Sequence, residues 1–157
     1  MQKKGYNFFN LPRECSIEDY KEAIDKIVGK YSKANGLVSI YSWGDVSAPG
    51  ISDIDIVLVF GKNAEKLPFL SRSFYFLDSE TRYLVRHPFV FTGEDSFKNA
   101  RYVYPDTGFR LLFGKNINIR RLSQSEGYYS GIALLNDIII RHYPRDFIGQ
   151  SVSKSIN

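Results

Sequence analysis

The first regular pattern along the chain is helical. Between residues 17 and 34 apolar side chains recur every three or four positions, which places them on one face of a helix. Ser16 and Asp19 have the form of a capping box at the start of this segment, and Gly36 follows its end. The pattern therefore predicts an amphipathic helix over residues 17–34.

Strand patterns follow in the middle of the chain. Apolar runs rich in β-branched and aromatic residues predict strands at 37–42 and 54–60, joined by a loop that contains Gly44, Pro49 and Gly50. The same kind of pattern predicts two more strands, at 82–92 and 109–115. Together with the helices, these runs predict an α/β (α+β) fold, in which a short mixed β-sheet is flanked by helices.

A second helix is predicted from about residue 125 to residue 143. Its segment 131–140 carries an apolar arc broader than the stripe of a surface helix, which predicts either a core position or contact with another chain. We expect this segment to form a homo-oligomer or to bind a helix of a partner protein. Residues 1–149 are predicted to form a single domain, and the polar tail 150–157 is predicted to be disordered.

Composition bounds the class of protein. The chain has 157 residues, of which 43% are hydrophobic and 24% charged, and this suits one globular domain. Its net charge of +4 permits an anionic substrate without requiring one. No stretch approaches the roughly 20 apolar residues of a membrane span, and the basic start lacks the apolar core of a signal peptide. The single cysteine, Cys15, fits a reducing compartment, so we expect a cytoplasmic protein with no membrane partner.

Asp53 and Asp55 open the apolar run 56–60 and are the leading candidates for chemistry. Side chains alternate along a strand, so the two carboxylates share one face at the mouth of a buried strand. There they repel each other unless a cation lies between them, and a hard divalent ion such as Mg²⁺ or Mn²⁺ supplies that charge. The alternative is a solvated pair of acids at a strand start.

The segment 37–60 resembles the DNA polymerase β-type nucleotidyltransferase superfamily. That family carries an apolar strand ending in Gly-Ser, a loop, and then Asp-x-Asp or Asp-x-Glu at the start of the next strand. Ser42 matches the serine, and Asp53 and Asp55 match the two acids. Tyr41 stands where the family has its glycine.

The resemblance implies a minimal nucleotidyltransferase domain with the nucleotidyltransferase fold. Asp53 and Asp55 would be the catalytic residues and would hold Mg²⁺ or Mn²⁺, while Ser42, Gly44 and Ser52 would face the phosphates of an NTP. A second alignment, which places the family's glycine at Gly44, stays open. The family's third acid lies on a strand beside the Asp-x-Asp strand. The predicted strand there contains no acid, and the acids that flank it are Glu80, Glu94 and Asp95.

Three functional hypotheses follow. The leading one is a metal-dependent nucleotidyltransferase that moves an NMP group from an NTP to an acceptor hydroxyl, and the acceptor can be a nucleic acid, a small molecule or a protein. The second is a catalytically degenerate domain of the same fold that binds nucleotide or a protein partner without turnover. In the third, Asp53 and Asp55 are surface carboxylates without a ligand.

Overall fold

The computed structural model describes residues 13–62, 64, 77–105 and 107–142. The chain forms two compact units, which we call the sheet unit and the helical unit. The sheet unit comprises Met1–Gly93 with Gly108–Asn116, and the helical unit comprises Glu94–Thr107 with Ile117–Asn157. One domain over 1–149 stays a prediction, and the tail 150–157 lies outside the described residues.

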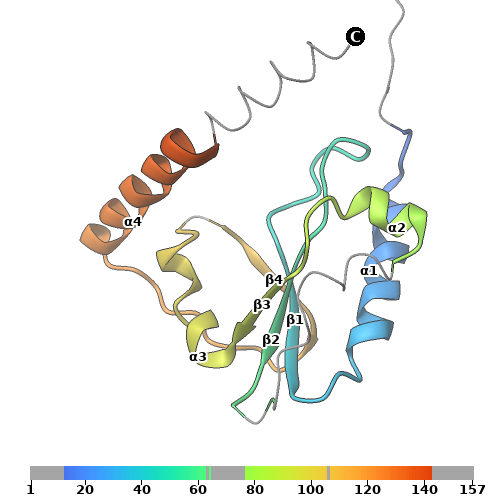
Figure 1. Cartoon of the computed structure of the whole chain (residues 1–157), viewed down its shortest axis with the longest axis horizontal. Coiled ribbons are helices and arrows are strands. Elements are labelled where there is room, and N and C mark those ends of the chain that lie inside the picture. Colours follow the sequence, from blue (N-terminus) through green and yellow to red (C-terminus); the bar gives the residue numbers. More distant parts are fainter. Residues whose placement is uncertain (1–12, 63, 65–76, 106, 143–157) are drawn as a thin grey trace, which may run out of the picture. The chain divides into compact units, whose positions relative to one another are not determined.

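The sheet unit contains a four-stranded mixed sheet in the order β3-β2-β1-β4 (Figure 1). β1 is antiparallel to both β2 and β4, whereas β2 and β3 are parallel. The predicted mixed sheet with helices is thereby confirmed, as is the pairing of the first two predicted strands. The elements of this unit are α1 (Ile17–Tyr31), β1 (Leu37–Trp43), β2 (Asp55–Phe60), α2 (Ser79–Leu84), β3 (Val90–Gly93) and β4 (Phe109–Gly114).

Helix α1 covers one face of the sheet. The capping box predicted at Ser16 and Asp19 is present, with each side chain bound to the backbone N–H of the other residue. Apolar side chains of α1 and α2 pack with residues from β1 and β2 in one core, on the side where Figure 1 shows both helices. The buried members of this core are Tyr20, Ala23, Ile27, Ile40, Ile54, Ile56, Leu58, Phe60, Leu77, Leu84, Val85 and Phe89.

The strand predicted at 82–92 is wrong over residues 82–89. The chain forms α2 as far as Leu84 and a loop over 85–89, and only Val90–Gly93 pairs as β3. The cause is an N-cap: the Asp78 carboxylate accepts hydrogen bonds from the backbone N–H groups of Glu80 and Thr81, which starts a helix. The apolar residues of this stretch still reach the core, although from a helix and a loop.

The helical unit contains α3 (Glu94–Phe97), a 3₁₀ turn (Ala100–Tyr102), α4 (Gln124–Asp137) and a π-helical turn (Ile138–His142). The helix predicted from residue 125 is confirmed through residue 142. A second capping box starts α4, in which Ser123 and Glu126 exchange hydrogen bonds with each other's backbone. None of the helices in the described part of the chain is long and apolar enough to cross a membrane.

Candidate functional site

A cavity of about 180 Å³ lies in the sheet unit at the end where β1 stops and β2 begins. Four of the five residues singled out from the sequence line it, namely Ser42, Gly44, Asp53 and Asp55. They come together because the two strands are antiparallel, with Trp43 paired with Asp55 across them. The structure therefore places both acids and two of the predicted phosphate-facing residues on one cavity wall.

The cross-strand register decides which side chains share a face of the sheet. Trp43 pairs with Asp55 on one face, and Ser42 pairs with Ile56 on the other, which α1 covers. Residues from both faces of the sheet line the cavity, because it lies at the ends of the strands rather than over either face. Any ligand there contacts the last residues of β1 and the first residues of β2.

The environment of Asp55 shifts the pKa of its carboxyl. Burial raises the pKa of its carboxyl above the usual range, and the nearby Asp53 carboxylate raises it further. A side-chain hydrogen bond from Trp43 and the charge of His87 act in the opposite direction without cancelling the shift. Asp55 is thus held in a place that disfavours its negative charge, and a cation beside it would reverse that preference.

His87, rather than any of the three acids weighed as a third carboxylate, lies beside Asp53. It stands between α2 and β3, and β3 runs parallel to the Asp-bearing strand β2. Its Nε2 atom lies 3.4 Å from Oδ2 of Asp53. Glu80 lines a different cavity, and Glu94 and Asp95 pair with Lys98 within the helical unit. None of Glu80, Glu94 and Asp95 therefore lines the cavity of the Asp pair, and the imidazole of His87 lies next to Asp53.

Tyr41, which the sequence resemblance aligns with the family's glycine, does not line the cavity. Its side chain is buried, and its hydroxyl lies 3.3 Å from both the carbonyl oxygen of Lys115 and Oδ1 of Asn116. The positive-φ residue at the end of β1 is instead Gly44, with φ of 73°. Its backbone N–H donates to the carbonyl of Gly108, so that donor is already used within the fold.

Ser52 belongs to the loop between β1 and β2 rather than to the cavity wall. Its hydroxyl accepts a hydrogen bond from the backbone N–H of Ala48, and its carbonyl accepts one from the hydroxyl of Tyr20. The same Tyr20 hydroxyl accepts from the N–H of Gly50. These bonds hold the loop against α1. The contacts of Ser52 are therefore structural contacts within the loop, and its side chain does not line the cavity.

Two cations on the cavity wall were not predicted from the sequence. Lys21 comes from α1 and Arg110 from β4, where it pairs with Ser42 across the strands. Both side chains are exposed. With Asp45, Asp53 and Asp55 the wall carries three carboxylates and two cations, a formal charge of −1. No local sequence signal marks these cations, because their position depends on the strand order and on how α1 packs.

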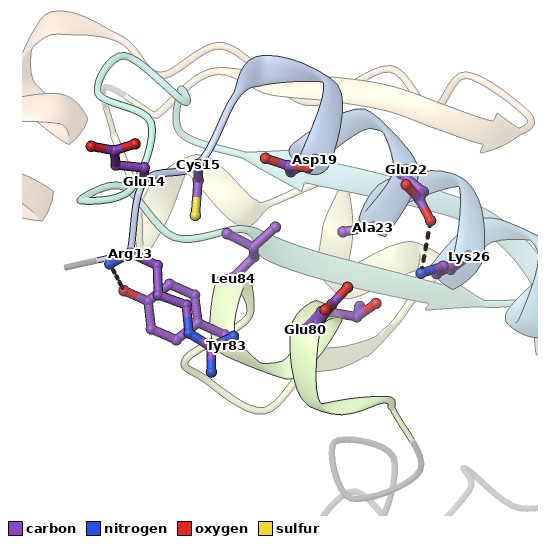
Figure 2. A pocket seen from close by; sticks show the side chains of 11 residues that line it. Arg13, Glu14, Cys15, Asp19, Glu22, Ala23, Lys26, Glu80, Tyr83 and Leu84 are labelled. Carbon is purple, nitrogen blue, oxygen red and sulfur yellow. Dashed lines mark hydrogen bonds and ion pairs between the residues drawn. The ribbon is translucent and has the colours of Figure 1, made fainter.

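A second cavity, of about 210 Å³, lies between α1 and α2 in the same unit (Figure 2). Its wall is rich in acids, but several of them have structural partners. Asp19 caps α1, and Glu22 lies 2.9 Å from Nζ of Lys26. The backbone N–H of Arg13 donates to the hydroxyl of Tyr83. These contacts join the segments that meet between α1 and α2, so we interpret this cavity as a gap in the packing of the two helices.

Within the described residues no group of three or more His, Cys, Asp or Glu side chains has an arrangement that could hold a metal ion. Comparisons of the chain with models of protein families, with curated proteins and with solved structures give no match. The resemblance over residues 37–60 therefore stays a prediction, and functional inference depends on the cavity itself.

Proposed function

We propose that the chain is a metal-dependent nucleotidyltransferase that moves an NMP group from an NTP to an acceptor hydroxyl. One observation carries the proposal: Asp53 and Asp55 share a cavity with the cations Lys21 and Arg110. One divalent ion changes the formal charge of that wall from −1 to +1, which favours an anionic ligand. A metal–triphosphate has the charge distribution that such a wall complements.

The Asp pair fits a hard divalent ion. Burial and the charge of Asp53 make the Asp55 carboxylate unfavourable without a counter-ion, and carboxylate oxygens are the ligands that Mg²⁺ and Mn²⁺ prefer. Asp53 and Asp55 would hold the ion. When bound, such an ion neutralises triphosphate charge and lowers the pKa of an attacking hydroxyl.

The chain's own side chains would position the nucleotide. Lys21 and Arg110 offer ammonium and guanidinium donors to phosphate oxygens, and Arg110 can do so with two parallel hydrogen bonds. The Ser42 hydroxyl, on the same face as Arg110, is a third donor. Phosphoryl transfer depends mainly on such positioning and charge stabilisation, so this set supports the reaction without a covalent intermediate.

A second candidate function is nucleotide binding without turnover. The observation that favours it is that none of the acids weighed as a third carboxylate lines the cavity, while the imidazole of His87 lies beside Asp53. A general base contributes typically about 10²- to 10⁴-fold to a rate, so a site without that carboxylate can bind a nucleotide and turn it over slowly or not at all. Metal and nucleotide binding are shared by both candidates, whereas pyrophosphate release belongs to the first alone.

The test pairs two measurements on the full chain. Calorimetry with each NTP in the presence of Mg²⁺ or Mn²⁺ measures binding, and pyrophosphate release across nucleic-acid, small-molecule and protein acceptors measures turnover. Binding with turnover supports the transferase, and binding alone supports the second candidate. No NTP binding at millimolar concentration contradicts both, which leaves the Asp pair as surface carboxylates.

Two variants make the binding measurement specific. Lys21→Gln with Arg110→Gln removes the cations of the cavity wall, and we expect NTP affinity to fall at least about 10-fold while Mn²⁺ affinity changes little, because a hydrogen bond to a charged group is worth about 1.5–3 kcal/mol. The matched control is Lys26→Gln, which removes a lysine of the same helix that lines the other cavity. A loss of binding free energy in the control that is half of the loss in the double variant, which removes twice the charge, would show that the effect is one of net charge.

A further inference from the structure

Helix α4 has one face bound within its own unit. The hydroxyl of Ser130, which is 6% exposed, donates to the carbonyl of Tyr102. One turn earlier, the Glu126 carboxylate accepts from the Tyr102 hydroxyl and from Nη2 of Arg120, the latter at 2.8 Å. The intramolecular contacts of α4 thus lie on the side of the helix that carries Glu126 and Ser130.

The opposite side of α4 presents an apolar seam, which consists of Tyr128, Ile132, Leu135 and Ile139. Their spacings are four, three and four residues, which is the heptad spacing of a coiled-coil seam. Their exposed fractions are 68%, 48%, 57% and 56%. A helix with its polar contacts on one side and a heptad seam on the other is built to pack against a second helix.

We propose that this seam packs against the same seam of a second copy of the chain. Between residues 127 and 140 the only side chain charged at neutral pH is Asp137, which lies on the side away from the seam. A partner with charges at this surface would bury them without a counter-charge, which is costly. A surface that is apolar and almost uncharged is complementary to itself, and a two-fold pair of identical helices satisfies it.

The area of this surface matches what a dimer needs. Three more exposed apolar side chains, Tyr129, Ile138 and Ile140, flank the seam, with exposed fractions of 71%, 46% and 61%. A fully covered aromatic side chain alone buries roughly 150–250 Å². Seven large side chains at about half exposure or more therefore offer several hundred Å², the order of the roughly 800 Å² per partner in a standard interface.

The experiment is sedimentation equilibrium of the full chain. We expect wild type to show twice the 18.0 kDa mass of the chain at about 100 µM and to dissociate towards the monomer mass on dilution. The variant Ile132→Glu with Leu135→Glu should weaken the dimer at least about 100-fold, because it places two charges at the centre of the seam.

Ala133→Glu is the matched control. Ala133 is exposed on the same helix, away from the seam, and the substitution adds a charge of the same sign, one where the seam variant adds two. We expect the control to remain a dimer, and circular dichroism should show that all variants keep the helix content of wild type. A monomeric wild type overturns the proposal, as does a dimer that survives the seam substitutions. A dimer lost equally in the control also overturns it, because the seam would then not be the specific contact.

Discussion

Asp55 in the sheet unit and Glu126 in the helical unit are both acids beside an aromatic hydrogen-bond donor, yet their environments act in opposite directions. Hydrogen bonds from Tyr102 first, and then from Ser123 and Arg120, lower the pKa of Glu126 to about 2. Burial and the charge of Asp53 raise the pKa of Asp55 in spite of its bond to Trp43. The fold satisfies the charge of Glu126 and leaves the charge of Asp55 partly uncompensated.

This difference separates a structural acid from a candidate ligand. Glu126 completes the capping box of α4 and pairs with Arg120, so its contacts account for its position. Asp55 has a single donor, Trp43, among the causes of its shift, and it lies on a cavity wall with a second carboxylate. Retaining two repelling acids at the mouth of a buried strand costs stability, and a metal ion is the partner that would offset that cost.

The largest expected effect is on metal binding. Asp53→Asn and Asp55→Asn should each weaken Mn²⁺ binding at least about 100-fold, because each removes one charge that faces the ion at short range. Calorimetry with Mn²⁺ is the measurement. Asp25→Asn, which removes the same charge from the exposed side of α1, should leave the affinity unchanged. Unchanged Mn²⁺ affinity in both site variants would show that Asp53 and Asp55, like Glu126, do not bind the metal ion.

How much of this site could be predicted from sequence depends on how local each signal is. Asp53 and Asp55 are adjacent in the chain to an apolar strand, so the period of that strand alone places them together. Lys21 and Arg110 are 32 and 57 residues away from Asp53, and only the order β2-β1-β4 and the packing of α1 bring them to the same cavity. The positions of these two cations therefore depend on tertiary structure, and no sequence motif predicts them.

The fold shows the same division. The capping box at Ser16 and the apolar runs of β1 and β2 are local signals, and the elements begin and end within a few residues of their predicted bounds. The error at 82–92 arose because apolar residues suit a strand, a helix or a core-facing loop equally well. The deciding signal is the capping carboxylate of Asp78, which precedes the stretch.

A smaller effect is expected at His87. Because its imidazole lies 3.4 Å from Asp53, His87→Asp would place a third carboxylate beside the pair. We expect Mn²⁺ affinity to rise about 10-fold, since affinity for such ions follows the number of charged oxygen ligands. His87→Ala is the control, which removes the imidazole without adding a ligand. If the Ala variant gains as much Mn²⁺ affinity as the Asp variant, the gain comes from removing the imidazole that competes for Asp53 and not from adding a third carboxylate.

The third prediction concerns the metal-free fold. Because the pKa of Asp55 is higher in the folded state, that state holds more protons between the two pKa values, and the free energy of unfolding falls as pH rises through this window. Asp55→Asn should therefore raise the free energy of unfolding at pH 7 by on the order of 1 kcal/mol. The gain should disappear below the ordinary Asp pKa of 3.8. Urea unfolding with a chelator at both pH values, with Asp25→Asn as control, checks the sign.

The smallest effect is expected at Glu126, where the sign reverses. Its depressed pKa means that the charged form stabilises the fold above the ordinary value of 4.5, and that this contribution is lost as pH falls towards about 2. Glu126→Gln can keep the capping-box bond from the Ser123 N–H through its one amide oxygen, but it loses the charge and the second acceptor oxygen. Because exposed ion pairs contribute little, its stability deficit should be small, present above pH 4.5 and lost as pH falls towards about 2. Carbon NMR of the Glu126 carboxyl measures the titration directly. A midpoint near 4.5 would mean that the bonds from Tyr102 and Arg120 do not hold in solution, and the contrast with Asp55 would then no longer distinguish a satisfied acid from an uncompensated one.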